Sequence, residues 1–374
     1  MLLSQLCKTA AGGTPLKSRR EFYEGGDIPW LLSGEVNNKN ITHTNKFITK
    51  KGLTGSSAKI FPKNTVVIAM YGATAGEVGI LRCEASTNQA VCGIYPNEKV
   101  LPEYLYYFFL NHKSVLVAQA VGNAQPNISQ EKIKNTFIKL PLIDEQQRIV
   151  DILDKAFADI EKARVNAEQN LKNARELFDS YLQQVFSQRG EGWVDEPLSQ
   201  CFKLRSGNNL TSKNMIAGDF PVFGGNEMVG THNDFNLSGD NVIVGRVGAL
   251  CGNARHIQQK VWLTDNAFKV VDFKYEFDHR FLTYMLNFKK LRNLARQAAQ
   301  PVISNSSLKD LKLSFPISVS EQKIISARFD RIFNDTDVLL SVYQKKIEAL
   351  GELKNSLLQK AFSGELTKSR GIAA

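Results

Sequence analysis

The sequence predicts an α+β protein in which two β-rich globular segments alternate with two long helices. Three observations support this fold class. Residues 144–187 and 320–362 both carry the apolar spacing of a long helix. A set of short motifs occurs twice in the same order. Short β-branched runs bounded by glycines lie in the segments before each long helix.

The first long helix is expected over residues 144–187, which contain no glycine and no proline. Its apolar residues recur at alternating steps of four and three, which is typical of one coiled-coil seam. The seam positions are Ile149, Leu153, Ala156, Ile160, Ala163, Ala167, Ala174, Leu177 and Tyr181. Such a helix would be ~65 Å long at ~1.5 Å per residue. We therefore expect it to act as a spacer or an assembly surface.

The second long helix is expected over residues 320–362 and has the same features. Its apolar positions are Ile325, Phe329, Ile332, Leu339, Tyr343, Ile347, Leu350, Leu353, Leu357 and Ala361. Both helices follow a proline-marked strand end, open with Glu-Gln and close on Phe-Ser. The offset is 176 residues both from Glu145 to Glu321 and from Phe186 to Phe362. The two helices are therefore predicted to be copies of one element.

The repeat extends through the globular segments, so that each half is a globular segment followed by a long helix. The paired motifs keep their order along the chain, which chance similarity would not preserve. They are Leu3-Ser4-Gln5 with Leu198-Ser199-Gln200, Gly12 or Gly13 with Gly207, Gly26–Pro29 with Gly218–Pro221, Gly72 and Gly76 with Gly248 and Gly252, Thr87–Ala90 with Thr264–Ala267, and Gln125–Ser129 with Gln300–Ser304.

Each globular segment is expected to be β-rich with a short helix. Val66–Met70 and Val242–Val244 are short β-branched runs, predicted to be buried strands. Tyr104–Asn111 and Phe281–Asn287 carry aromatics at helical spacing, so their rings are expected in the core rather than on a base-stacking platform. The expected domains are 1–143, 144–187, 188–317 and 318–374, with a polar linker at 188–196.

The net charge of +10 is unevenly distributed along the chain. Residues 1–143 carry +7 and residues 188–317 carry +4, whereas residues 144–187 carry −3. This distribution favours a polyanion partner for the globular segments and a different partner for the helices. A merely basic protein would have the same composition, so charge alone leaves both interpretations open.

The cysteine pattern indicates a reducing compartment. The five cysteines are scattered, form no Cys-x-x-Cys pair and are odd in number, so a cytoplasmic protein without a disulfide framework is expected. The sequence has no signal peptide and no apolar run long enough to span a bilayer, so no membrane association is expected.

Catalytic patterns are missing from the sequence. It has no phosphate-binding GxxxxGK[ST] loop, no GxGxxG motif after a strand, and no Asp/Asn-Pro-Pro-aromatic tetrapeptide of an amino-methyltransferase. The five histidines lie too far apart in sequence for HExxH or a paired metal site. Two Glu-x-Lys patterns lie in the second long helix and are interpreted as solvated charges. We therefore expect no catalytic residue, no bound cofactor and no metal, but a duplicated binding protein.

One ordered series of motifs runs along nearly the whole chain: Gly12–Pro15, Gly26–Trp30, Gly72 and Gly76, Thr87–Ala90, Gln125–Ser129, Leu140–Val150 and Gln359–Leu366. In this order the motifs resemble the specificity subunit of type I restriction-modification systems. The resemblance depends on the order of the motifs rather than on any single one. The second half has Gly207-Asn208-Asn209 in place of Gly12–Pro15, which weakens that motif there.

The resemblance implies two target-recognition domains of mixed α/β structure, related by a pseudo-two-fold repeat and separated by two long helices that form an antiparallel coiled coil. It also implies a non-catalytic subunit that binds double-stranded DNA. Two modification subunits would dock on the helices and methylate adenine with S-adenosylmethionine. Restriction subunits would add translocation and cleavage with ATP and Mg²⁺. Because the two domains differ in sequence, the DNA target is expected to be bipartite and asymmetric.

Candidate DNA-binding residues are the basic and polar side chains of the glycine-rich and turn segments. Arginine and lysine can pair with guanine or phosphate, and asparagine with adenine. The first-domain candidates are Lys17, Arg19, Arg20, Lys39, Lys50, Lys51, Tyr71 and Thr74. The second-domain candidates are Arg205, Asn208, Asn209, Lys213, Asn226, Arg246 and Arg255. For each of them, an ordinary surface or turn residue is the competing interpretation.

Two other functions remain open on the sequence. The chain could be a coiled-coil scaffold or regulator that binds proteins without reading DNA. It could also be a nuclease with an unrecognised site, which would require cleavage by the isolated chain with magnesium. DNA binding that weakens steeply with salt would support DNA reading, because phosphate contacts depend on salt. A salt-insensitive complex with a protein partner and no DNA affinity would support the scaffold.

Overall fold

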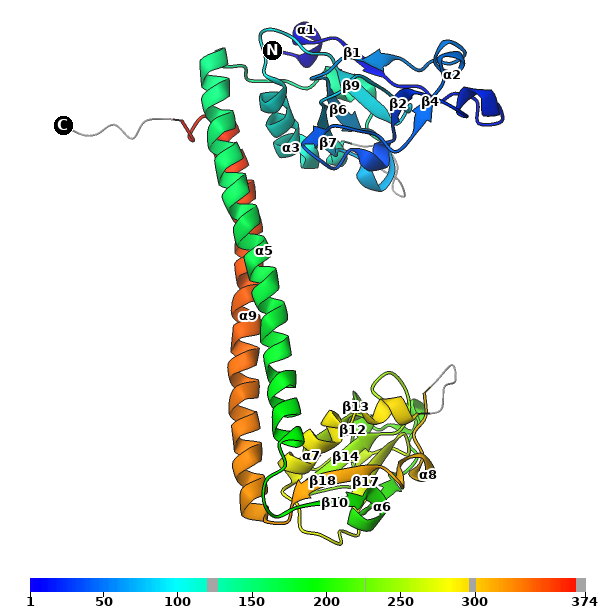
Figure 1. Ribbon diagram of the computed structural model, residues 1–374, viewed down its shortest axis with the longest axis vertical. Coiled ribbons are helices and arrows are strands. Elements are labelled where there is room, and N and C mark those ends of the chain that lie inside the picture. Colours follow the sequence, from blue (N-terminus) through cyan, green and yellow to red (C-terminus); the bar gives the residue numbers. More distant parts are fainter. Residues whose placement is uncertain (120–126, 226, 296–300, 368–374) are drawn as a thin grey trace, which may run out of the picture. The chain divides into compact units, whose positions relative to one another are not determined.

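The computed structural model describes residues 1–119, 127–225, 227–295 and 301–367. The chain divides into two compact units, and each contains one globular domain with part of both long helices (Figure 1). Unit 1 comprises Met1–Asn166 and Lys346–Ala374, and unit 2 comprises Ala167–Lys345. Among the described helices, none combines the length and the apolar character needed to cross a membrane.

The globular domain of unit 1 contains two small sheets. The larger has the order β1-β9-β6-β7-β3, and the smaller has the order β4-β2-β8-β5. Its strands are β1 (Thr9–Ala11), β2 (Ile28–Leu31), β3 (Asn40–Ile41), β4 (Phe47–Ile48), β5 (Ile60–Phe61), β6 (Val66–Ala69), β7 (Val78–Leu81), β8 (Ala85–Thr87) and β9 (Val91–Ile94). Its helices are α1 (Leu3–Leu6), η1 (Arg20–Phe22), η2 (Ser33–Glu35), α2 (Lys50–Thr54), η3 (Gly72–Thr74), α3 (Pro102–Ala118) and α4 (Gln130–Lys134).

The globular domain of unit 2 repeats this plan with three sheets. Their orders are β11-β17-β14-β15, β13-β12-β16 and β10-β18. The strands are β10 (Trp193–Pro197), β11 (Lys203–Ser206), β12 (Phe220–Gly224), β13 (Glu227–His232), β14 (Asn241–Gly245), β15 (Ala254–Ile257), β16 (Trp262–Leu263), β17 (Ala267–Val271) and β18 (Lys312–Pro316). The helices are α6 (Leu198–Cys201), η4 (Ser212–Asn214), α7 (His279–Phe288), η5 (Leu291–Leu294) and α8 (Asn305–Leu308).

The central strands show the internal repeat most directly. In unit 1, β6 pairs antiparallel with β7 and β9, and Val66 lies opposite Ile80. In unit 2, β14 pairs antiparallel with β15 and β17, and Val242 lies opposite His256. The predicted buried strands are confirmed, and the predicted domain helices are longer than expected, as α3 and α7. Their aromatic residues are largely buried in the two cores.

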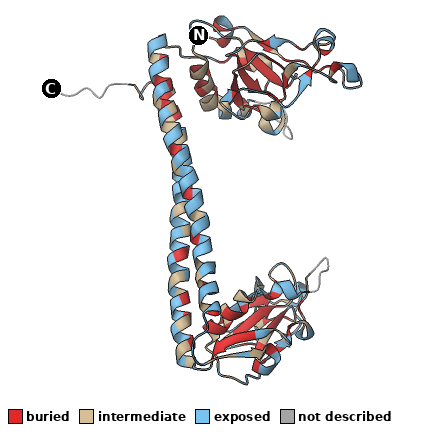
Figure 2. Ribbon diagram, viewed as in Figure 1, coloured by how far each residue is buried: buried red, intermediate tan, exposed pale blue. Residues whose placement is uncertain are grey.

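The two long helices are α5 (Ile143–Ser187) and α9 (Val319–Ser363), and they pack antiparallel. In unit 1, Leu153 near the start of α5 and Leu358 near the end of α9 share one core. In unit 2, Leu182 and Phe186 near the end of α5 share a core with Phe329 near the start of α9. The paired helices therefore contribute to both domain cores. Figure 2 shows buried residues, in red, along the two helices as well as in the domain sheets.

One detail of the predicted seam differs in the structure. Leu177, Leu339 and Leu353 are exposed, although the heptad count places them on the seam. In the second half of α5 the buried positions are Ala167 and Ala174, one heptad apart, then Leu182, eight residues further on, and Phe186. A straight α-helix has about 3.6 residues per turn, and seven residues therefore fall ~20° short of two full turns. A strict seven-residue apolar pattern thus gradually rotates away from the face that contacts the partner helix.

Candidate nucleic-acid interface

Three motifs described above meet in one turn of the first domain: Gly12–Pro15, Gly26–Trp30 and Thr87–Ala90. The backbone of Gly12 approaches Thr87 so closely that an added Cβ would lie 2.1 Å from the Thr87 Oγ1. At Gly13 the added atom would lie 2.3 Å from the backbone nitrogen of Ala58. The indole Nε1 of Trp30 donates to the Gly13 carbonyl at 3.1 Å. Glycine is needed here because no side chain fits between the segments.

A surface groove of about 470 Å³ opens beside this turn. Its polar side chains come from the repeated motifs and from neighbouring loops. The lining residues are Thr14, Lys17, Tyr23, Trp30, Leu32, Lys46, Asn88 and Gln89. The Thr14 hydroxyl donates to the side-chain oxygen of Gln89, which links two of the motifs. The groove thus combines two lysine ammonium groups with amide groups, which can bond phosphate and base edges.

The second domain builds the same turn from different side chains. A Cβ on Gly207 would lie 2.2 Å from the Leu263 carbonyl oxygen. The indole Nε1 of Trp262 donates to the Asn208 carbonyl at 3.2 Å, a tryptophan-to-turn bond of the same kind as Trp30 makes. Asn208 and Asn209 are exposed where the first domain has Gly13 and Thr14. The turn is therefore repeated, while the groups that it presents are not.

The structure brings four first-domain candidates together. Arg20 lies in η1, and Lys50 and Lys51 form the first turn of α2. Thr49, which caps α2, donates its hydroxyl proton to the Glu21 carbonyl at 2.8 Å and so joins the two segments. The four exposed cations of this basic cluster are Arg19, Arg20, Lys50 and Lys51. Within it, Arg19 lies 3.9 Å from the Glu21 carboxylate.

The remaining exposed candidates are dispersed. Lys17 lies in the groove, and Tyr71 lies just before η3 in a bridge with Asn127. In the second domain, Arg205 lies 3.6 Å from the Asp272 carboxylate. Two further exposed residues are Lys213 in η4 and Arg255 in β15, whose guanidinium lies 5.5 Å from the Phe223 ring centroid.

Three candidates are half-buried, and one lies outside the described residues. Lys39 forms an ion pair with Asp154 of α5 and lies 4.7 Å from the Tyr107 ring centroid. Arg246 donates to the Asp265 carbonyl at 3.2 Å. Thr74 is half-buried in η3. The cations of Lys39 and Arg246 thus have partners within the fold. Asn226 is the candidate that falls outside the described residues.

The repeated Glu-Gln pair at the start of each long helix has a structural role that its sequence pattern alone does not reveal. Gln146 and Gln322 are fully buried and make the same three hydrogen bonds. The Gln146 amide donates to Lys99 and Pro141 carbonyls at 3.0 and 2.9 Å and accepts from the Leu101 N–H at 2.9 Å. Each glutamine thereby fixes the start of a long helix to the loop before the domain helix. Repetition of an uncharged polar residue at the same place in both halves was the available signal.

Gln322 repeats this pattern in unit 2. Its amide donates to the Pro316 carbonyl at 2.8 Å and the Glu276 carbonyl at 3.3 Å, and its oxygen accepts from the Asp278 N–H at 2.9 Å. A second repeated contact joins Tyr107 to Asp154 and Tyr284 to Asp330, where the tyrosine hydroxyl donates to the helix carboxylate.

Comparison with known proteins identifies a family. The family profile described as "Type I restriction modification DNA specificity domain" matches residues 1–169 and 190–349. The type I restriction enzyme EcoprrI specificity subunit of Escherichia coli is 26% identical, over 92% of this chain and 90% of its own. The MjaIX specificity subunit of Methanocaldococcus jannaschii is 25% identical, over 97% and 92%.

Solved structures share the fold. A chain from a study titled "Structural basis underlying complex assembly and conformational transition of the type I R-M system" has a TM-score of 0.80 at 18% identity, covering 98% of this chain and 97% of that one. The HsdS subunit of Thermoanaerobacter tengcongensis has a TM-score of 0.65 at 17% identity, covering 98% and 96%. With the profile matching most of both repeats, the chain belongs to the family of DNA specificity subunits of type I restriction-modification systems, the non-catalytic subunits of those complexes.

Proposed function

We propose that this chain reads a bipartite, asymmetric DNA target, with residues 1–143 reading one part and residues 188–317 the other. The observation that carries this proposal is the repeated turn. The glycine contact recurs at Gly12 and Gly207, and in each domain a tryptophan indole N–H, from β2 in one and β16 in the other, bonds the turn. The side chains that follow the glycine change from Thr14 and Lys17 to Asn208 and Asn209. A common scaffold with different donors and acceptors would present different base contacts at each half-site.

The long helices α5 and α9, within the segments 144–187 and 318–374, are the proposed docking surface for two modification subunits. Leu142 and Ile317 occupy equivalent positions just before α5 and α9, and they are 84% and 56% exposed. A single exposed leucine means little. The same exposed apolar position in both repeats, however, fits two copies of one partner. Val165, Ile324, Phe333, Val338 and Val342 add exposed apolar surface to the two helices.

The partners would supply the chemistry. Modification subunits would bind S-adenosylmethionine and methylate adenine, and restriction subunits joined through them would use ATP and Mg²⁺. The proposed compartment is the cytoplasm, which is consistent with five cysteines that all carry free thiols.

The deciding experiment is a map of N6-methyladenine in host DNA with and without this gene, in the presence of its partner subunits. We expect a new two-part motif with a fixed gap of unspecified bases. Replacing residues 1–143 by the equivalent domain of a relative should then change one half of the motif. A change in both halves contradicts one-domain reading. No new methylation, with the partners expressed and bound, favours the protein-binding scaffold instead.

Docking is tested separately with Leu142→Asp and Ile317→Asp. Each change should weaken one modification-subunit contact, and the double variant should weaken both, measured by the mass of the assembled complex. Ile216→Asp is the control, because Ile216 is exposed in the second domain and outside the helices. Complexes of unchanged mass and affinity in the double variant would contradict this docking surface.

A further inference from the structure

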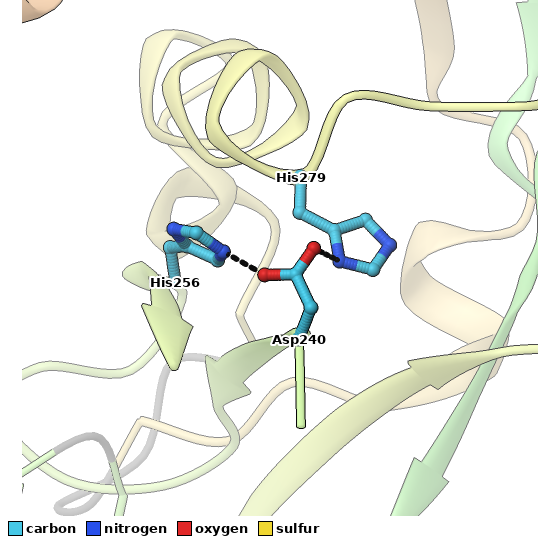
Figure 3. A group of neighbouring side chains, drawn as sticks. All are labelled: Asp240, His256 and His279. Atoms are coloured by element: carbon cyan, nitrogen blue, oxygen red, sulfur yellow. Dashed lines mark hydrogen bonds and ion pairs between the residues drawn. The ribbon is translucent and has the colours of Figure 1, made fainter. Parts of the chain in front are cut away.

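Two histidines and an aspartate meet in the second domain, as Figure 3 shows. Asp240 comes immediately before β14, His256 lies on β15, and His279 is the first residue of α7. One carboxylate oxygen of Asp240 contacts the Nε2 of His256, and the other lies 2.9 Å from the Nδ1 of His279. We call these three residues the histidine cluster.

The cluster contains the ligand types that bind divalent transition metals. Each residue offers one ligand atom, and the three atoms lie within 4.8 Å of one another. Zinc bonds to imidazole nitrogen and carboxylate oxygen of about 2.0–2.2 Å leave neighbouring ligand atoms roughly 3–3.5 Å apart. Small side-chain rotations would therefore bring all three atoms onto one ion.

The Nδ1 of His279 is a second, independent observation. Within the described residues, this buried nitrogen has no partner at hydrogen-bond geometry, although the Asp240 oxygen lies 2.9 Å away. Buried polar atoms are nearly always satisfied. A metal ion held between the nitrogen and the carboxylate would satisfy both groups.

In the first domain an arginine side chain joins the elements that correspond to those of the histidine cluster. Arg82 follows β7, and its guanidinium donates to the Asn64 side chain at 2.8 Å and to Glu103 of α3 at 2.5 Å. At the 176-residue offset, Asn64 corresponds to Asp240 and Arg82 to Gln258. The second domain therefore has an anion where the first has a neutral amide, and a neutral residue where the first has the cation.

The other substitutions between the repeats point the same way. Ile80, opposite Val66, corresponds to His256, opposite Val242. Pro102, the first residue of α3, corresponds to His279, the first residue of α7. Apolar residues in the first domain are thus replaced by imidazoles that face the added carboxylate. An external cation would take the place of the missing guanidinium.

We propose that Asp240, His256 and His279 bind a divalent transition-metal ion of the zinc class, which ties β14 and β15 to the start of α7. A cavity of about 530 Å³ lined by Asp240 and His279 leaves room for water to complete the coordination. His279 follows Asp278, whose N–H bonds Gln322 of α9. The ion thereby also steadies the junction between the second domain and its long helix.

The test uses the full chain without a histidine tag, stripped of metal by a chelator. Co²⁺ serves as the spectroscopic probe and Zn²⁺ as the titrant in calorimetry. We expect one ion per chain and a rise in the unfolding temperature of roughly 5 °C or more at a hundredfold excess over Kd. Mg²⁺ should not compete, because it prefers all-oxygen sites.

Variants assign the ion to the cluster. His256→Gln and His279→Gln should each weaken Zn²⁺ binding by about tenfold or more, since each removes one of three protein ligands. His43→Gln is the matched control, because His43 lies on an exposed loop of the first domain. Circular dichroism confirms folding, and Asp240→Asn offers a milder variant that keeps the side-chain shape. No binding by the wild-type chain, or binding unchanged in His256→Gln, His279→Gln and Asp240→Asn, would overturn the proposal. Because the isolated chain is measured, DNA reading can fail without affecting the result.

Discussion

The side-chain oxygen of Gln322 accepts a hydrogen bond from the backbone N–H of Asp278 at 2.9 Å, and Gln146 makes the same bond to Leu101 at the same distance. Both glutamines stand at the start of a long helix, and both bonds end at the residue before a domain helix. The fold therefore uses one device twice to fix each globular domain to its helix.

Removing this device should destabilise the unit that contains it. Gln322→Ala removes a buried hydrogen bond to the Pro316 carbonyl and part-buried bonds to the Asp278 N–H and the Glu276 carbonyl. We therefore expect a decrease of about 2–4 kcal/mol in the free energy of unfolding. Urea denaturation of the full chain measures it, and Gln146→Ala should act similarly on unit 1. Gln147→Ala is the control, because Gln147 is exposed and its side chain bonds Asp151 within the same helix. If Gln322→Ala and the control unfold with equal free energy, the glutamine bonds do not stabilise the attachment of the domain to its helix.

The tyrosine–aspartate contacts should contribute less. Tyr284→Phe removes the hydroxyl that donates to Asp330 at 2.7 Å, and we expect a cost of about 1–2 kcal/mol because the acceptor is charged. A double-mutant cycle with Asp330→Asn isolates the pair. A coupling energy near zero would show that the contact is incidental. Arg280 also pairs with Asp330 at 2.6 Å, so the cycle is best repeated with Arg280→Met.

Two glycines should respond to alanine in opposite directions. Gly207→Ala places a methyl group 2.2 Å from a backbone oxygen, so it should distort the turn and lower both stability and DNA affinity of the assembled complex. Gly351→Ala has open space around it in the interior of α9 and should stabilise the chain by about 0.5–1 kcal/mol. Thermal unfolding compares the two. A neutral Gly207→Ala would contradict the tight packing of the turn.

The basic cluster should affect DNA affinity through salt. Replacing both Lys50 and Lys51 by glutamine should weaken binding of the assembled complex, and it should reduce the slope of log K against log salt by about 0.9 for each phosphate that the variant no longer neutralises. Lys63→Gln is the control, an exposed lysine outside the cluster. An unchanged slope in the double variant would exclude both lysines from binding phosphate.

His112 should make the first domain acid-sensitive. Its ring stacks on Phe108 at 5.5 Å, and burial lowers the pKa of its imidazole below the ordinary value. The unfolded chain then binds the proton more readily than the folded one, so stability is retained above pH ~6.5 and is lost as the pH falls below it. His112→Phe should remove this part of the pH dependence, measured by urea denaturation between pH 8 and pH 5. An unchanged profile would assign the dependence to other groups.

Much of the fold followed from local pattern. The long helices, the buried strands at Val66 and Val242, and the order of the repeat are visible because helical and strand periods and ordered motifs are properties of the linear chain. The family was also recognisable, because many short motifs in fixed order are specific together. The course of the seam beyond Ala174 could not be predicted from the sequence, because the rotation of one helix against its partner depends on three-dimensional packing.

The sequence by itself determined two β-rich domains, two long helices and their duplication, because these depend on residues close together along the chain. Only the tertiary structure decided which polar groups meet. It paired Lys39 with Asp154, gathered Arg20 with Lys50 and Lys51, and brought His256 and His279 to Asp240 across strands and a helix start. Such contacts join residues far apart in sequence, and their partners are fixed by strand register and helix packing, which no local period encodes.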